Sequence, residues 1–150
     1  MLSAAALGAV SLGLFLLVGT ASARRDRAAA PIVTVVQHGG LCFGGRGRPG
    51  HECRAEFRIT DRWISGPGRP RRLTHAERAA LLRAIEALDL RYLRSHPFEG
   101  TCPTATDGPE SIYRFRGFPH RLASCTYDLE AVRAVQLTDR LLMSLEPIRR

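Results

Sequence analysis

The chain has 150 residues, of which 45% are hydrophobic and 24% are charged. This length and composition are typical of a single globular domain and exclude a collagen-like or wholly disordered chain. The formal net charge is +8, and all 22 basic residues are arginines. The charge favours a polyanionic partner, but the use of arginine alone is also typical of a GC-rich genome, in which case the charge carries no function.

The first predicted element is an apolar segment over residues 2–23 that contains no charged side chain. It ends in Ala21-Ser22-Ala23, the small-x-small pattern that precedes a signal-peptidase site. The segment is also long enough to span a bilayer, and the arginines that follow it favour an uncleaved anchor. We expect a signal peptide or alternatively a membrane anchor at residues 1–23, a linker at 24–30 and one domain at 31–150. The first case predicts export to the periplasm or the extracellular space, and only the second predicts contact with the membrane.

Two strands are predicted next. Residues Ile32–Gln37 are mostly β-branched and are bounded by proline and glycine. Residues Cys53–Thr60 alternate between apolar or small and charged side chains, which is typical of an antiparallel strand with one buried face. Trp63 and Ile64 either extend this strand or begin a short third one, and the Pro- and Gly-rich segment 65–72 then breaks regular structure.

Thr74 and Glu77 have the spacing of a capping box, in which each side chain accepts a bond from the backbone N–H of the other residue. A helix is therefore predicted to begin here, and apolar residues at helical spacing from Leu81 onward give it one buried face. The helix is predicted to end near Asp89. A long irregular segment, rich in turn-forming residues, follows over residues 94–110.

Two further strands are predicted at Ser111–Arg116 and Arg121–Tyr127, separated by a Gly-Phe-Pro turn. Asp128 is then expected to cap a last helix over Leu129–Leu145. The resulting order is ββαββα. It predicts an α+β fold in which an antiparallel sheet of about four strands carries two helices on one face.

An even number of cysteines follows the export-like segment, so a framework of two disulfides is expected. The cysteines are Cys42, Cys53, Cys102 and Cys125. Three pairings are open. We favour Cys42 with Cys53 and Cys102 with Cys125, because each pair then closes a local excursion of the chain.

The loop between the first two cysteines is rich in glycine and arginine, and Arg46 and Arg48 are candidate binding residues on it. A loop closed by a disulfide loses less entropy on docking. Further along, Arg69, Arg71 and Arg72 could join these arginines in binding a polyanion.

The alternative interpretation of the first loop is a zinc site formed by two imidazoles and two thiolates. Its ligands would be His38, Cys42, His51 and Cys53. Their spacing matches no common zinc motif, so no metal and no cofactor are expected.

The sequence contains no nucleophile elbow, zinc-binding helix or dinucleotide-binding turn. Asp107 and Glu110 are assigned to a turn, His96 and His120 to loops, and His75 to the start of the first helix. Tyr113 and Phe115 share one strand face and are assigned to the core rather than to base stacking. We therefore do not expect an enzyme, and nucleic acid is disfavoured as a partner.

One set of residues spans most of the predicted domain: the strand ending "QHGG", a glycine at 44 or 45, Leu73-Thr74 with Glu77 at the helix start, Asp107 and Tyr113. Together they resemble the emfourin family of inhibitors of protealysin-like metalloproteases. It implies a small α+β fold and protease inhibition. The four cysteines, the apolar N-terminal segment and the arginine-rich insertion before Cys53 depart from that family's pattern.

Cys102 is followed by Pro103, Thr104 and Ala105 in the long irregular segment. This resembles secreted subtilisin inhibitors, in which a Cys-Pro pair leads into an exposed reactive loop, and the resemblance makes Pro103, Thr104 and Ala105 candidate binding residues. The sequence therefore predicts an exported binding domain whose partner is a protease or another protein. The alternative is an arginine-rich domain that binds a polyanion or the surface of the cell envelope.

Overall fold

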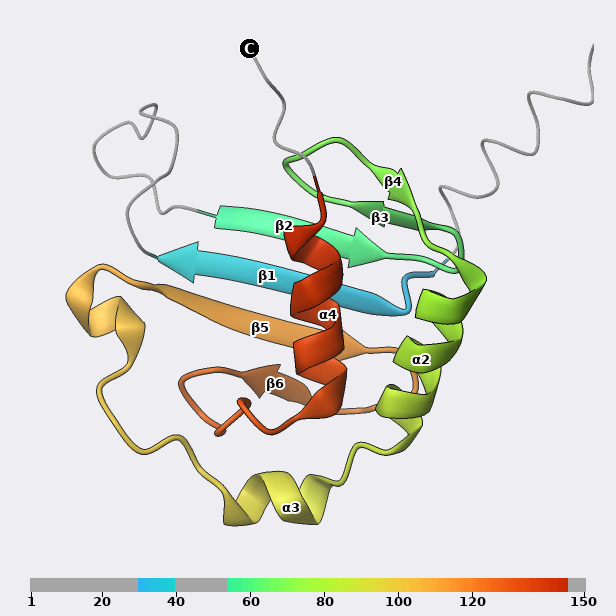
Figure 1. The fold of residues 1–150 in the computed structure, drawn as a ribbon. Coiled ribbons are helices and arrows are strands. Elements are labelled where there is room, and N and C mark those ends of the chain that lie inside the picture. Colours follow the sequence, from blue (N-terminus) through green and yellow to red (C-terminus); the bar gives the residue numbers. More distant parts are fainter. Residues whose placement is uncertain (1–29, 40–53, 146–150) are drawn as a thin grey trace, which may run out of the picture.

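Six antiparallel strands form one sheet in the computed structural model, which describes residues 30–39 and 54–145 (Figure 1). In chain order they are β1 (Val33–Gly39), β2 (Arg54–Ile59), β3 (Trp63–Ser65), β4 (Arg71–Arg72), β5 (Pro109–Phe115) and β6 (Arg121–Ala123). Their order across the sheet is β4-β3-β2-β1-β5-β6. The α+β class is confirmed, whereas the sheet is wider than the four strands expected because the short strands β3 and β4 extend one edge.

The described helices are α2 (His75–Glu86), α3 (Leu90–Ser95) and α4 (Arg133–Met143). Figure 1 shows α2 and α4 in front of the same face of the sheet, with α3 beyond the edge formed by β6. The short helix α3 lies where the sequence predicted the end of helical structure. It forms because the Asp89 carboxylate accepts a bond from the Arg91 N–H at 2.7 Å, and because Leu93 is buried.

The capping box at the start of α2 is confirmed. The Thr74 hydroxyl accepts a bond from the Glu77 N–H at 3.2 Å, and the Glu77 carboxylate accepts one from the Thr74 N–H at 2.8 Å. Leu81 and Ile85 on the predicted apolar face are buried against the sheet and α4.

The start of the last helix is not where the sequence predicted it. Helix α4 begins at Arg133 rather than at Leu129, and its N-cap residue Val132 makes no side-chain capping bond. The Asp128 carboxylate instead accepts a bond from the Glu130 N–H at 3.1 Å, which closes a turn ahead of the helix. Asp128 therefore behaves as an aspartate in a local turn, the conformation that competes with helix capping for this residue type.

The two faces of the sheet differ in burial because side chains of a strand alternate between them. The core lies between the sheet and helices α2 and α4. It contains one side chain or more from each of the five longer strands: Val33, Val35, Ile59, Ile64, Tyr113, Phe115 and Leu122. The assignment of Tyr113 and Phe115 to the core is thus confirmed, since both are 4% exposed.

A disulfide between Cys102 and Cys125 is present, as predicted. Cys125 lies in a turn after β6, so this strand ends earlier than the expected Tyr127. The turn region is also bonded to the long connection, because the Phe98 N–H donates to the Thr126 carbonyl at 3.1 Å. Cys42 and Cys53 lie outside the described residues, so their predicted pairing stays a prediction.

None of the helices in the described part of the chain is long and apolar enough to cross a membrane. The segment predicted as a signal peptide or anchor, residues 1–23, lies outside that part. The disulfide is compatible with an exported protein, since oxidising compartments preserve such bonds.

Candidate functional site

The first candidate site is the turn over Cys102–Asp107, which we call the 102–107 turn. It leads into β5 and contains one turn of 3₁₀ helix. The disulfide to Cys125 anchors its first residue. Thr104 and Ala105, two of the residues expected to bind a partner, are exposed at its tip, and Pro103 is partly buried at its base.

Hydrogen bonds close the turn internally. The Ala105 N–H donates to the Cys102 carbonyl at 2.9 Å, and the Gly108 N–H donates to the Pro103 carbonyl at 2.7 Å. The Thr106 hydroxyl donates to the same Pro103 carbonyl at 3.2 Å. The turn is therefore ordered before any partner binds.

The end of the turn depends on two unusual backbone positions. Asp107 adopts the left-handed conformation with φ 59°, which aspartate tolerates better than most residues. At Gly108 a Cβ atom would lie 2.9 Å from the Pro103 carbonyl oxygen, so a larger residue would push the turn open.

The turn packs against the end of β1. Gly39, with φ +79°, lies so close that a Cβ on it would be 3.1 Å from Thr104 Cγ2. Beside it, His38 Nε2 lies 3.0 Å from a Glu110 carboxylate oxygen across the β1–β5 pair. The 102–107 turn therefore lies beside the end of β1 and the start of β5, at one end of the sheet.

The residues proposed for zinc binding are not brought together in the described structure. His38 is engaged with Glu110, and Cys42, His51 and Cys53 lie outside the described residues. Within residues 30–39 and 54–145 there is no group of three or more His, Cys, Asp or Glu side chains that could hold a metal ion.

The remaining histidines lie where the sequence placed them. His75 is the exposed first residue of α2. His96 stacks on Tyr92 with ring centroids 4.0 Å apart, and His120 contacts the edge of Phe118 in the loop after β5.

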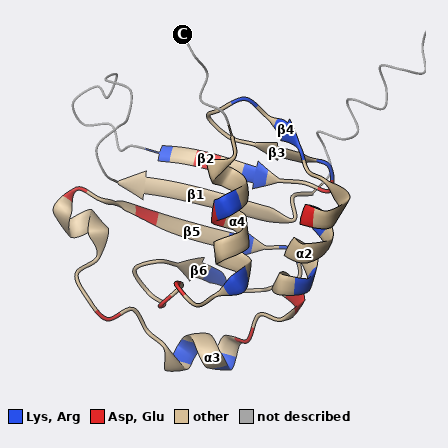
Figure 2. Cartoon of the chain, in the orientation of Figure 1, with Lys and Arg blue, Asp and Glu red and all other residues tan. Residues whose placement is uncertain are grey.

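The arginines expected to bind a polyanion do not share one environment. Arg71 donates two bonds to the Glu77 carboxylate, at 3.1 and 3.0 Å, and one to the Ser144 hydroxyl at 2.7 Å. Arg72 lies over the Trp63 ring, and Arg69 is exposed. Figure 2 shows basic residues on strands and helices alike rather than gathered on β4. Arg46 and Arg48 lie outside the described residues.

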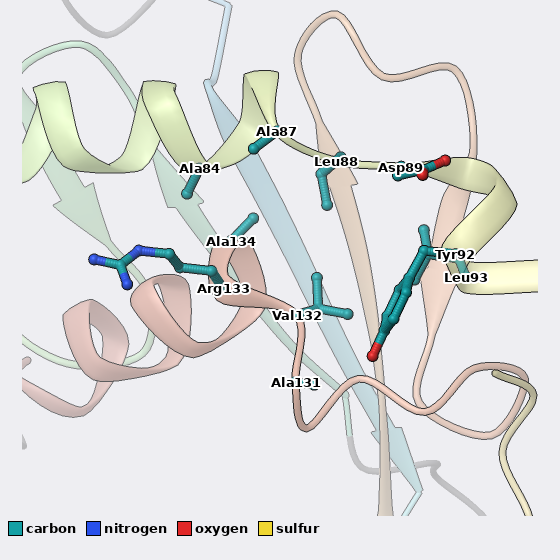
Figure 3. Close-up of a pocket in the computed structure, with 10 residues that line it drawn as sticks. All are labelled: Ala84, Ala87, Leu88, Asp89, Tyr92, Leu93, Ala131, Val132, Arg133 and Ala134. Atoms are coloured by element: carbon teal, nitrogen blue, oxygen red, sulfur yellow. The ribbon is translucent and has the colours of Figure 1, made fainter.

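A small pocket of about 190 Å³ lies between the end of α2, α3 and the start of α4 (Figure 3). Its lining is largely apolar, and Val132 and the Tyr92 ring face one another across it. The Asp89 carboxylate is turned outward and caps α3. The volume is below the roughly 300 Å³ at which small-molecule sites begin, so the pocket does not define a ligand site.

Comparisons of the chain with protein-family models, with curated proteins and with solved structures found no match.

Proposed function

We propose that the domain is a binding module that presents the 102–107 turn to a protein partner, and that this partner is a protease. The proposal rests on one observation: the tip of this turn is exposed, and yet its conformation is fixed by contacts with the rest of the domain. Thr104 and Ala105 are exposed, while a disulfide, backbone bonds and contact with Gly39 hold the turn in place. A pre-ordered turn binds with a smaller loss of conformational entropy than a free loop does.

The conformation of the turn argues for one mode of binding over another. Proteins that bind an extended peptide at a sheet edge form backbone hydrogen bonds with it, so that the peptide is added as a β-strand. The carbonyls of Cys102 and Pro103 are already used inside the 3₁₀ turn. We therefore propose that the turn contacts the rim of a protease as a rigid knob and does not enter the active site as a substrate.

Export through cleavage within residues 1–23 is part of the same proposal. The Cys102–Cys125 disulfide supports it, because such a bond persists in an oxidising compartment, where secreted proteases also act.

The test uses the full chain, oxidised, at micromolar concentration against a panel of secreted metallo- and serine proteases. We expect at least one protease to be slowed and Ala105→Glu to weaken that inhibition by about tenfold or more, because it places a charge at the centre of the contact. The matched control is Ala76→Glu, an exposed alanine in the first turn of α2, which should change inhibition by less than about twofold. Thermal unfolding should be nearly the same in both variants.

Two results would contradict the proposal. One is that no protease in the panel is slowed, and the other is that both variants lose inhibition equally. Cleavage of the chain between Cys102 and Asp107 during the assay, detected by mass spectrometry, would instead show that the turn binds as a substrate.

A further inference from the structure

The face of the sheet opposite α2 and α4 carries a pattern of charge that the 102–107 turn does not use. Figure 1 shows both of these helices on one side of the sheet. Residues that alternate with the core positions point to the other side. They include Thr34 and Val36 on β1, and these are only partly buried although β1 is one of the two central strands.

Strand pairing aligns three arginines across this face. Thr34 lies opposite Arg58 of β2 on one side and opposite Arg114 of β5 on the other. Arg114 in turn lies opposite Arg121 of β6. We call Arg58, Arg114 and Arg121 the arginine row. It crosses four adjacent strands, and three strand spacings correspond to about 14 Å.

The row brings like charges together at a cost. Residues directly opposite on antiparallel strands have neighbouring side chains, and like charges in such positions are destabilising. Arg71 of β4 and Arg116, which follows β5, are by contrast paired with carboxylates: Arg71 donates to Glu77 at 3.0 Å and Arg116 to Asp61 at 3.2 Å. Among the residues that the structure describes, no carboxylate is bonded to Arg114 or Arg121, and both are exposed. Arg58 shares its charge with Glu56 at 2.7 Å and remains 61% exposed.

The three arginines of the row lie along one line across the sheet. The next row across the same strands consists of Glu56, Val36, Ile112 and Ala123, which is apolar apart from one carboxylate. The row beyond it contains His38, which lies between Glu110 of β5 and Arg54 of β2. A flat anionic surface would meet both Glu56 and Glu110 together with the arginines of this face. A single anionic chain along the arginine row would avoid Glu110 and meet one carboxylate, Glu56, beside Arg58.

Aromatic side chains do not extend the row. Trp63 is the aromatic residue on this face of the described strands, and the guanidinium of Arg72 lies 5.4 Å from its ring centroid. One side of the Trp63 ring is therefore occupied by a cation. Single-stranded nucleic acid usually gains its affinity from bases that stack on aromatic rings, and this face offers little support for such stacking.

The geometry points to the arginine row as a binding site for a linear, phosphate-bearing polymer without aromatic bases. Exposed guanidinium groups bind phosphate through paired N–H donors. Arg114 and Arg121 lie one strand spacing apart, and Arg58 lies two spacings from Arg114 because Thr34 stands between them. The bound polymer replaces the missing counter-charge of Arg114 and Arg121. This site is distinct from the 102–107 turn and does not depend on the function proposed for it.

The test measures binding of long-chain inorganic polyphosphate to the full, oxidised chain by calorimetry over a range of salt concentrations. Arg114→Gln/Arg121→Gln should lower the affinity by about tenfold or more at low salt and reduce the log–log salt slope by about 1.4, as for two lost phosphate contacts on a single strand. The matched control, Arg83→Gln/Arg140→Gln, removes the same charge from exposed positions on α2 and α4. It should change the affinity by less than about threefold, because only the general field of the protein is reduced.

Thermal unfolding shows whether the Arg114→Gln/Arg121→Gln variant is folded. Because the substitution relieves repulsion, Arg114→Gln/Arg121→Gln should unfold at the same temperature as the unsubstituted chain or at a higher one when no polymer is present. Polyphosphate should raise the unfolding temperature of the unsubstituted chain and have a smaller effect on this variant.

Three results would overturn the proposal. Equal losses of affinity in the two double variants would assign binding to net charge alone. Tighter binding of oligo-dT than of polyphosphate at equal phosphate concentration would assign the face to nucleic acid. Tighter binding of vesicles containing anionic phospholipid would assign it to a membrane surface.

Discussion

At the scale of single residues, several arginines of this chain stabilise the fold through carboxylates that they hold in the charged state. Arg116 and Arg78 both donate to Asp61, and their bonds lower the pKa of that carboxyl group. Arg71 lowers the pKa of Glu77 from its ordinary value of 4.5 to about 2, with help from the bonds to Thr74. These positions explain why an excess of arginine in the sequence is not by itself a binding site.

The Glu77 carboxylate is the centre of the cluster that ties β4, α2 and the end of α4 together. Its stabilising effect should be complete above pH 4.5 and be lost as the pH falls toward 2, because the folded state binds the proton less readily than the unfolded chain. We expect Glu77→Gln to lower the free energy of unfolding by about 1–2 kcal/mol at pH 7, since the cluster is partly exposed.

Urea denaturation at a series of pH values measures this effect as the difference between the two proteins. The difference should shrink as the pH approaches 2. Glu86→Gln, an exposed position in the same helix, should change the free energy by less than about 0.5 kcal/mol throughout. A Glu77→Gln difference that stays constant from neutral to acidic pH would show that the charge is not its source.

At the scale of elements, local chemistry decided what could be predicted. The start of α2 was predictable because the Thr74–Glu77 spacing is itself the capping interaction. Helix α3 was missed because six residues are too few for a periodic pattern, and its formation depends on burying Leu93. Helix α4 begins later than predicted because the same aspartate signal, Asp128, can close a turn or cap a helix.

The contact between α4 and β5 could not be predicted from sequence periodicity either. The Tyr113 hydroxyl donates to Asp139 Oδ1 at 2.8 Å, and burial raises the pKa of both groups. Tyr113→Phe should lower the free energy of unfolding by about 1–2 kcal/mol, because it removes a partly buried hydrogen bond and leaves the carboxylate without this donor. Chemical denaturation provides the measurement. Tyr92→Phe, at a tyrosine that is 39% exposed, should have almost no effect, and equal effects of both substitutions would refute the role of the bond.

At the scale of the whole molecule, the limits of prediction come from contacts between distant segments. Alternation along β2 and β5 showed which residues share a face, but the pairing of β1 with both strands joins segments far apart in the sequence. The arginine row depends on this register and on the alignment of Arg114 with Arg121 across the last hairpin. A shift of the strand register by one residue would place these arginines in the core. The row could therefore not be predicted from the sequence of each strand taken separately.

The disulfide framework also acts on the whole molecule, since it links the long connection after α3 to the turn that follows β6. Cys102 and Cys125 are separated by 23 residues, and closing a loop of this size stabilises a fold by about 3 kcal/mol in the chain-entropy model. Neither cysteine belongs to the buried core. Cys102→Ala/Cys125→Ala should therefore keep the secondary structure seen by circular dichroism while losing about 2–3 kcal/mol of unfolding free energy.

The Cys102→Ala/Cys125→Ala variant also tests whether Cys42 and Cys53 form the second predicted disulfide. Cys42 and Cys53 are still present in it, so adding reductant should lower its stability further if these two cysteines are paired. Without reductant, the mass of the unsubstituted chain should be four hydrogens below that of the fully reduced form, because all four cysteines are then oxidised. A variant that reductant does not affect, together with a mass only two hydrogens below the reduced form, would show that Cys42 and Cys53 are free thiols. That outcome would restore the zinc interpretation of His38, Cys42, His51 and Cys53 as the explanation to be tested by metal analysis.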